Sequence, residues 1–228
     1  MKRLGIIGGM GPEATSDLFL KIIKNTPAKK DQEHIPIVID NFPQIPDRTA
    51  FLKGMGVSPL PFLLESVKRL EKCDVNYLCM PCNTAHYFAD KIKASTPIPF
   101  VSIVETTLES IISADKKYTK IGLMATDGTF IGKVYHRVFE ENGLKINDFN
   151  SELQNSIMES IYLVKSGLKK EASEIFVKTY MEIIDDGYDC LIAGCTEIPV
   201  LFPFVDLSLS DVYDATDLLA RKVVSLCL

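Results

Sequence analysis

The chain has 228 residues, of which 25 are Lys or Arg and 30 are Asp or Glu, so its formal net charge is −5. Hydrophobic residues make up 46% and charged residues 24%, which excludes a disordered, collagen-like or coiled-coil chain and allows one domain or two small lobes. The acidic balance argues against nucleic acid or an anionic membrane surface as a partner, and no stretch approaches the ~18 consecutive apolar residues of a membrane span.

The N-terminal residues imitate a signal peptide, because Lys2 and Arg3 precede the apolar run 4–10. Pro12 and Glu13 follow at once and glycines break the run, so the segment predicts a first β-strand instead. Six cysteines are too few for a disulfide scaffold in a chain of this length. We therefore expect a cytoplasmic protein whose cysteines stay reduced.

Short apolar runs alternate with helical patterns along the whole chain. Strands are predicted at 4–7, 35–39, 75–80, 100–103, 121–125 and 191–193, and several lack polar alternation, which is typical of strands buried on both faces of a parallel sheet. Helices are predicted near 13–26, 62–72, 84–95, 105–114, 130–142, 151–165, 169–186 and 211–226. The alternation predicts an α/β fold with crossover connections, in which ligands bind beyond the carboxyl ends of the strands.

The segment 41–61 departs from this alternation. It contains four prolines and two glycines, with Asp47 and Arg48 in its middle. Loops of this length are usually functional or disordered, so we expect an irregular segment that contributes to a site.

Two internal similarities divide the chain. Segments 74–84 and 189–197 each have an acidic residue, an apolar strand and then a cysteine followed by polar residues, and segments 2–8 and 120–126 form a second similar pair. The repeats predict two similar α/β lobes with mainly parallel sheets. If these lobes are related by pseudo-twofold symmetry, their strand ends converge on a cleft between them. The first lobe would comprise 1–100 with 209–228, and the second 101–208. Chance similarity between buried strands is the competing interpretation.

Cys82 and Cys195 occupy matching positions at the carboxyl ends of strands in the two predicted lobes. Each precedes a predicted helix start, where free backbone N–H groups and the helix dipole favour a thiolate. A single cysteine in such a position is equally well explained as a small buried hydrophobic residue without a chemical role. Two that converge on a cleft would present a thiol from each side, which suits proton transfer at a carbon centre from opposite faces.

Two other chemistries involve Cys82. Cys79 and Cys82 form a C-x-x-C pair, as redox dithiols and zinc sites do, but no second closely spaced Cys/His pair accompanies it, and we expect no metal. His86 lies four residues after Cys82 on the same helix face, which would permit a Cys–His hydrolase. A histidine in that position is more often a surface or supporting residue.

Residues 9–14, Gly-Met-Gly-Pro-Glu-Ala, match the G-x-G-x-x-G/A dinucleotide fingerprint, and Asp40 ends the next predicted strand. Any tight strand-to-helix turn needs such glycines, and Pro12 suits a first helical position. A nucleotide-binding oxidoreductase is therefore an alternative that rests on a weak motif.

Five motifs occur in order along the chain: Gly-Gly-Met-Gly-Pro (8–12), Ile-Pro-Asp-Arg-Thr (45–49), Pro-Cys-Asn-Thr-Ala-His (81–86), Ala-Thr-Asp-Gly-Thr (125–129) and Gly-Cys-Thr-Glu-Ile-Pro (194–199). Together they resemble the aspartate/glutamate racemase family, and within it the aspartate racemases most closely. The resemblance spans nearly the whole chain. It implies two similar α/β lobes, an active site between them, and catalysis without a cofactor or metal.

The resemblance also assigns roles to residues of this chain. It implies that Cys82 and Cys195 are the catalytic pair, one as a thiolate that removes the α-proton and the other as a thiol that returns one to the opposite face. Arg48 and Lys165, which taken singly would be surface charges, match the positions that bind the side-chain carboxylate of aspartate. Met10 and Thr49 would line the pocket. Backbone N–H groups near the helix starts would hold the α-carboxylate, at Asn83, Thr84, Ala85 and Thr196.

The expected activity is the interconversion of L- and D-aspartate by a homodimer. Glutamate racemases typically open with Asp-Ser-Gly and have His after the second Gly-Cys-Thr, whereas this chain has Gly-Gly-Met-Gly and Glu197. A racemase of broader amino-acid scope is the nearest alternative, although such relatives often lack the Arg and Lys. A Cys82–His86 hydrolase and a non-catalytic amino-acid-binding module are further alternatives. The segment 131–135 departs from the family pattern and leaves the role of the preceding turn open.

Overall fold

The computed structural model describes residues 1–206, 209 and 212–228. The first of its two sheets has the strand order β2-β1-β3-β4, and all its pairings are parallel. Its strands are β1 (Leu4–Gly8), β2 (Ile37–Asn41), β3 (Tyr77–Cys79) and β4 (Phe100–Val101). The second sheet, ordered β6-β5-β7-β8, is also parallel. Its strands are β5 (Ile121–Met124), β6 (Ile146–Asn147), β7 (Cys190–Ala193) and β8 (Val212–Asp214).

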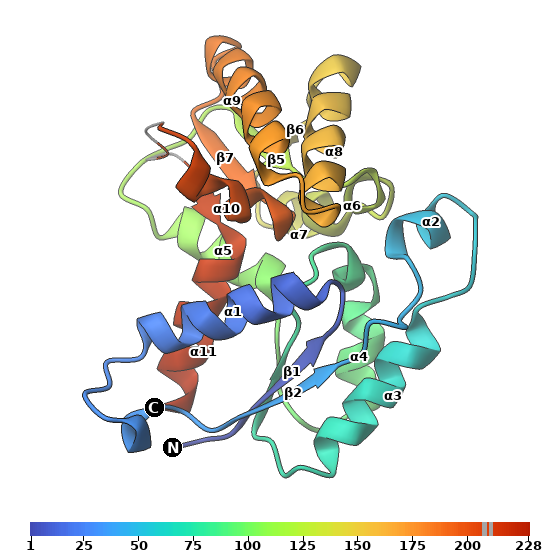
Figure 1. Ribbon diagram of the computed structural model, residues 1–228, viewed down its shortest axis with the longest axis vertical. Coiled ribbons are helices and arrows are strands. Elements are labelled where there is room, and N and C mark those ends of the chain that lie inside the picture. The colour runs from blue at the N-terminus through green and yellow to red at the C-terminus, as the bar shows by residue number, and fades with distance from the viewer. Residues whose placement is uncertain (207–208, 210–211) are drawn as a thin grey trace.

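The two sheets have the same topology, since each places its second strand beside the first, and its third and fourth on the other side. Figure 1 shows them in two layers of helix and sheet, one above the other. The predicted class, two α/β lobes with parallel sheets, is therefore confirmed.

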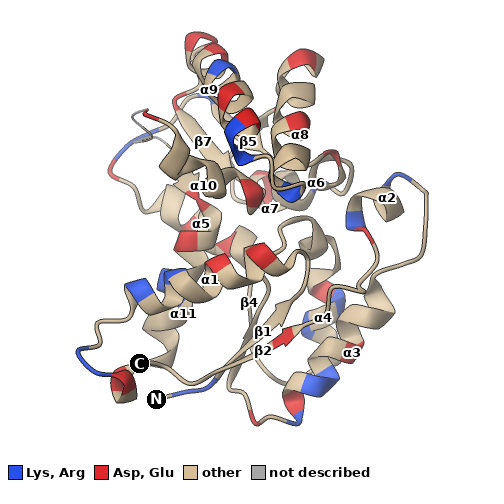
Figure 2. Ribbon diagram, viewed as in Figure 1, with Lys and Arg blue, Asp and Glu red and all other residues tan. Residues whose placement is uncertain are grey.

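Helices cover both sheets. Those of the first half are α1 (Pro12–Asn25), α2 (Arg48–Leu52), α3 (Leu60–Glu71), α4 (Ala89–Ser95) and α5 (Ile103–Ile112), with 3-10 turns η1 (Asp31–Glu33) and η2 (Thr84–Phe88). Those of the second half are α6 (Asp127–Ile131), α7 (Val134–Glu141), α8 (Ser151–Lys165), α9 (Lys169–Asp185), α10 (Glu197–Leu201) and α11 (Ala215–Cys227), with the 3-10 turn η3 (Phe202–Phe204). Figure 2 shows that most Lys, Arg, Asp and Glu residues lie on these helices and on the connections rather than on the strands. No described helix has the length and apolar character needed to cross a membrane.

The last strand and the last helix attach to different halves of the molecule. β8 pairs with β7 in the second sheet, although its residues fall in the range that the sequence analysis placed with the first lobe. α11 instead packs against α1 and α5, and the Lys2 N–H donates to the Cys227 carbonyl oxygen at 2.8 Å, which brings the two termini together (Figure 1). The predicted lobe end at 208 and the predicted helix start at 211 lie outside the described residues.

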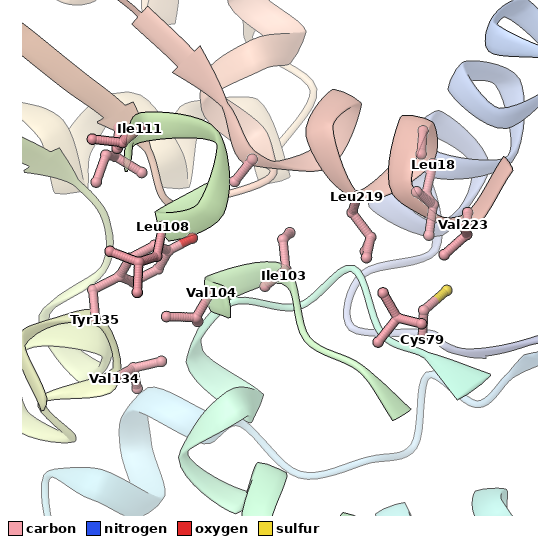
Figure 3. Packing of buried hydrophobic residues seen from close by; sticks show 14 of the residues in the cluster. Leu18, Cys79, Ile103, Val104, Leu108, Ile111, Val134, Tyr135, Leu219 and Val223 are labelled. Atoms are coloured by element: carbon pink, nitrogen blue, oxygen red, sulfur yellow. The ribbon is translucent and has the colours of Figure 1, made fainter. Parts of the chain in front are cut away.

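One apolar cluster runs through both halves of the molecule. α5 lies at its centre: Ile103 and Val104 lie between Leu219 of α11 and Tyr135 of α7 (Figure 3). Burying each such side chain fully is worth ~1.5–3 kcal/mol. This helix therefore joins the two halves by a continuous core, and separate clusters fill the remainder of each half.

The proline-rich segment is more regular than its sequence suggests. The Asp47 carboxylate accepts a hydrogen bond from the Ala50 backbone N–H at 2.6 Å and so begins α2, five residues long, where an irregular loop was expected. This cap is a strong local signal for a helix start. It fixes Arg48 and Thr49 at the first turn of α2, and α2 itself packs against α6 (Figure 1).

Candidate active site

A narrow cavity of about 20 Å³ lies between the two halves. Its lining contains every residue that the sequence analysis selected except Ala85, which is fully buried and packs in the first-half core. The lining residues are Met10, Asp47, Arg48, Thr49, Cys82, Asn83, Thr84, Thr126, Lys165, Cys195, Thr196 and Glu197. The structure thus brings together groups from α2, η2 and α8 that are far apart in the sequence.

A wider pocket of about 340 Å³ adjoins the narrow cavity, because the two share Asp47, Arg48, Lys165, Thr196 and Glu197. Its other lining residues include Glu13 at the start of α1 and Val164 near the end of α8. An ion pair between Lys169 and Glu13 connects the starts of α9 and α1 beside it. The cysteines therefore lie at the inner end of a pocket whose walls come from both halves.

Cys82 follows β3 and precedes η2, and only 7% of its surface is exposed. Its backbone carbonyl accepts a hydrogen bond from His86 Nδ1 at 2.9 Å, and His86 Nε2 accepts one from the Ile103 backbone N–H at 3.1 Å. Both ring nitrogens are therefore engaged with the backbone, and burial lowers the pKa of His86 to about 4, which keeps the ring neutral. The histidine connects η2 to α5 and does not form the dyad that a Cys82–His86 hydrolase would require.

Cys195 follows β7 in the same way and is equally buried. Its thiol donates to the Glu197 Oε2 atom at 2.9 Å, and the Thr196 hydroxyl donates to the same oxygen at 3.1 Å. Burial and the neighbouring Glu197 carboxylate raise the pKa of Cys195 well above its usual value, and the Lys165 ammonium opposes them only in part. Cys195 is therefore a protonated thiol at neutral pH.

Two cations face these thiols. Arg48 donates from Nη1 to the carbonyl oxygens of Ile45 at 3.3 Å and Pro46 at 3.1 Å, while its buried Nε has no partner in the described part of the chain. Burial alone would lower the pKa of Lys165, but Cys195, Glu197 and Cys82 outweigh it and raise that pKa, so the ammonium stays charged. A carboxylate in the cavity would meet both groups.

Asn83 offers a second unsatisfied donor. Its Oδ1 accepts a hydrogen bond from the Tyr135 hydroxyl at 2.6 Å, while its buried Nδ2 has no partner among the described residues. The tyrosine thus fixes the orientation of the amide, since only the oxygen can accept. An anionic or carbonyl oxygen entering the cavity would complete the bonding of Asn83.

Threonine hydroxyls join the two halves beside the cavity. Thr84 Oγ1 lies 2.9 Å from Thr126 Oγ1 and 3.0 Å from Thr129 Oγ1. A Cβ on Gly128 would lie 2.7 Å from the Thr49 hydroxyl oxygen and 2.9 Å from the Thr49 Cα, so this turn approaches α2 too closely for any other residue. The Ala-Thr-Asp-Gly-Thr motif, whose role the sequence left open, therefore forms the contact between the halves.

An ion pair reinforces that contact. Lys53, just after α2, lies 2.6 Å from the Asp127 carboxylate, which also accepts from Gln154 at 3.0 Å. Burial raises the pKa of Asp127, but the hydrogen bonds from Lys53 and Gln154 lower it by more than burial raises it. The pKa of Asp127 is therefore below its usual value. Asp127 therefore keeps the start of α6 attached to the end of α2.

The remaining sequence hypotheses find little support. Cys79 is fully buried within β3 and all six cysteines are free. Asp40, which accompanies the dinucleotide fingerprint at the end of the next strand, pairs with Arg69 at 2.8 Å. Gly9 lies against the Phe42 backbone, where a Cβ would be 2.3 Å from the Phe42 carbonyl carbon, so the glycine motif allows close packing of two chain segments. In the described ranges, no group of three His, Cys, Asp or Glu residues is placed to hold a metal ion.

Three residues of the cavity wall were not selected from the sequence as site residues: Asp47, Thr126 and Glu197. Tyr135, behind Asn83, was also missed. The sequence analysis used Glu197 only to compare this chain with glutamate racemases. Its position two residues after Cys195 does not reveal the hydrogen bond, because the turn before α10 determines it.

Two similar α/β halves that each contribute one cysteine to a shared polar cavity define a class of two-lobed, two-thiol sites. Comparison with known proteins identifies this class: the family model described as Asp/Glu/Hydantoin racemase matches residues 7–223, and the chain belongs to that family. It is accordingly an amino-acid racemase, of a kind that works without a cofactor.

Among curated proteins, the broad specificity amino-acid racemase RacX of Bacillus subtilis is 26% identical over 97% of this chain and 96% of its own length. Among solved structures, the aspartate racemase of Picrophilus torridus is 27% identical with a TM-score of 0.86, covering 100% of this chain and 94% of that one. An aspartate racemase homologue from Pyrococcus horikoshii OT3 is 25% identical with a TM-score of 0.76, covering 100% and 99%.

Proposed function

We propose that this protein interconverts L- and D-aspartate, with Cys82 and Cys195 as paired proton carriers. The observation that carries the proposal is the shared cavity, where a cysteine from each half of the molecule lies together with Arg48 and Lys165. The similarity to an aspartate racemase over the whole chain supports the same substrate.

The two thiols divide the reaction into removal and return of one proton. Because Cys195 is a protonated thiol in this structure, Cys82 has to act as the base in that form of the enzyme: it takes the α-proton while Cys195 delivers its own proton to the opposite face. The reverse reaction exchanges these roles. The pair titrates as one coupled system, since turnover needs one thiolate and one thiol at a time.

The cations of the cavity suit a dicarboxylic amino acid. A carbanion beside a carboxylate is costly unless positive charge and hydrogen-bond donors are already in place. Arg48 with its unpaired Nε, Lys165 and the Asn83 amide supply them without moving. We assign Arg48 and Lys165 to the side-chain carboxylate, and backbone N–H groups of Asn83, Thr84, Ala85 and Thr196 to the α-carboxylate, with Met10 and Thr49 on the cavity wall.

A racemase of broader amino-acid scope is the second candidate, because the relative with that name matches nearly the whole chain. The homodimeric state and the cytoplasmic location also stay predictions from the sequence.

A substrate panel separates the two candidates. The purified protein, without added cofactor, is incubated separately with the L-enantiomers of aspartate, glutamate, alanine and homoserine, and the product enantiomers are quantified by chiral chromatography. The proposal expects kcat/KM for aspartate to exceed that of each other amino acid at least tenfold. Comparable values for alanine or homoserine would replace it by the broader activity, and no turnover of any of the four would contradict both.

A further inference from the structure

Glu197 holds a carboxylate directly against the Cys195 thiol. Only 8% of the residue is exposed, and its Oε2 atom accepts hydrogen bonds from both the Cys195 thiol and the Thr196 hydroxyl. Glu197 is the first residue of α10, and its side chain turns back toward the strand end rather than outward into solvent. A carboxylate taken out of water is costly unless it is hydrogen-bonded, so its position beside a reactive thiol calls for a functional reason.

Several charged and titratable groups surround this pair. The Lys165 ammonium, on α8, lies near the Cys195 thiol. Arg48, the first residue of α2, and Asp47, which caps that helix, line the same cavity. Cys82 lies across the cavity, and Tyr135 of α7 is near enough to interact with the Cys195 charge. Of these groups, Glu197 has a direct hydrogen bond to the thiol of Cys195 in the described structure.

We propose that Glu197 takes and returns the thiol proton of Cys195, so that this cysteine serves as an acid toward one enantiomer and as a base toward the other. The inference rests on the two-cysteine function proposed above and adds to it a third participant, which acts through Cys195 and not on the substrate.

The proton balance of the two roles differs. As an acid, Cys195 breaks its S–H bond, the proton goes to the substrate carbanion, and a thiolate remains beside the Glu197 carboxylate and the Lys165 ammonium. As a base, Cys195 acts in the form of the enzyme in which Cys82 is protonated. It first passes its proton to Glu197 Oε2, which leaves the charge of the Cys195–Glu197 pair unchanged. The Cys195 thiolate then forms a new S–H bond with the α-proton while the C–H electron pair stays on carbon, and the Cys82 thiol gives its proton to the opposite face of that carbon and becomes a thiolate. Without Glu197, that thiol proton would have to leave for solvent from a buried position.

The best test separates thiol ionisation from turnover. L- and D-aspartate have equal free energies, so any variant must lower kcat/KM equally in the two directions, and kinetics alone would not distinguish a proton partner from a structural residue. Ionisation of Cys195 does distinguish them. Removing the carboxylate removes its repulsion of the thiolate, so the thiol should ionise at lower pH even though catalysis becomes slower.

The experiment uses the full chain with Glu197→Gln, which keeps the size of the side chain, and the matched control Glu174→Gln on the exposed surface of α9. Thiolate absorbance at 240 nm is recorded from pH 6 to 10, and the spectrum of the same protein carrying Cys195→Ser is subtracted. We expect E197Q to lower kcat/KM for aspartate at least tenfold in both directions and to form the Cys195 thiolate at least one pH unit below the wild type. E174Q should match the wild type in both measurements.

Two results would overturn the inference: unchanged turnover in E197Q, or reduced turnover with the Cys195 ionisation curve unmoved, which is what a purely structural role gives. If circular dichroism shows that E197Q is unfolded, Glu197→Asp undergoes the same titration and should move the curve in the same direction by a smaller amount; an unmoved curve again counts against the inference. A wild-type protein that does not racemise aspartate, but whose Cys195 curve moves in E197Q, would refute the proposed substrate and leave the Glu197–Cys195 coupling in place.

Discussion

Arg48 enters the cavity with part of its guanidinium unsatisfied. Two backbone carbonyl groups hold Nη1 in place, but the buried Nε has no partner among the described residues. A buried donor without a partner costs about 1–3 kcal/mol, which a bound carboxylate would recover. The residue is therefore stabilised by the ligand that it is proposed to bind.

Replacing Arg48 should chiefly weaken binding of the side-chain carboxylate. A hydrogen bond to a charged group is worth about 1.5–3 kcal/mol, so Arg48→Ala should lower kcat/KM for aspartate by roughly 10- to 150-fold, mostly through KM. Calorimetric binding of succinate, which has two carboxylates and no amino group, should weaken in parallel. An unchanged KM together with unchanged succinate binding would show that Arg48 does not contact the substrate.

Tyr135 acts on the site through Asn83. Tyr135→Phe preserves the buried ring but leaves Asn83 Oδ1 without its donor, which costs about 1–3 kcal/mol and frees the amide to rotate. We expect a lower melting temperature and a several-fold loss of kcat/KM. A Phe variant that melts earlier but keeps full activity would limit Tyr135 to packing.

Among the secondary-structure elements, η2 and α5 are connected by a single histidine. His86 bonds the Cys82 carbonyl on one side and the Ile103 N–H on the other, and it lies against the Phe100 ring. The sequence places His86 correctly one turn after Cys82, but it predicts a continuous helix 84–95 where the structure begins with a 3-10 turn. The ring nitrogens of His86 bond the backbone of Cys82 and Ile103, so they are not available to the Cys82 thiol.

The pH dependence of stability should report this histidine. Its pKa is about 4 in the folded protein, below the ordinary value of 6.5, so between these values the unfolded chain binds a proton that the folded chain does not. The free energy of unfolding should therefore fall as the pH drops from 6.5 to 4, by up to about 3 kcal/mol from this group. Urea unfolding of the wild type and His86→Gln at several pH values tests this. The stability difference between them should shrink as pH falls, and a constant difference would contradict the assignment.

The regular elements were predictable where a repeating pattern is long enough to recognise. Helices α8 and α9 follow their predicted ranges closely, whereas β6, with two residues, and β8, with three, carry too few positions for any pattern. The helix α2 was missed because four prolines suggested a loop, and only the Asp47 cap reveals it. The Cys195–Glu197 bond was missed since it depends on the turn before α10 and not on a helical or strand period.

At the scale of the whole molecule, two sets of contacts hold the two halves together. A continuous apolar core runs along α5 and α11, and a polar contact of threonines, Gly128 and the Lys53–Asp127 pair connects α2 with α6 beside the cavity. The sequence repeats predicted that two strand ends would converge, and the cavity has a cysteine from each. The contacts that set their relative placement come from short turns, which the repeats do not describe.

Gly128 tests how strictly this contact positions α2. An added Cβ in Gly128→Ala would lie 2.9 Å from the Thr49 backbone, which a rotamer change cannot relieve. Overpacking of this kind costs typically ~1–3 kcal/mol, and here it would displace Arg48 as well. We expect a lower melting temperature together with at least a tenfold loss of kcat/KM. Unchanged kinetics would show that α2 can move without affecting the site.

The most direct test of the account follows L-aspartate in deuterium oxide with the wild type, Cys82→Ser, Cys195→Ser and the control Cys73→Ser, which changes a half-buried thiol outside the cavity. Nuclear magnetic resonance measures α-deuterium and polarimetry measures inversion. The account predicts D-aspartate carrying α-deuterium from the wild type and from C73S, and at least a hundredfold slower racemisation by C82S and by C195S while both stay folded. Racemisation near the wild-type rate by either of these two variants would contradict the paired-thiol reaction.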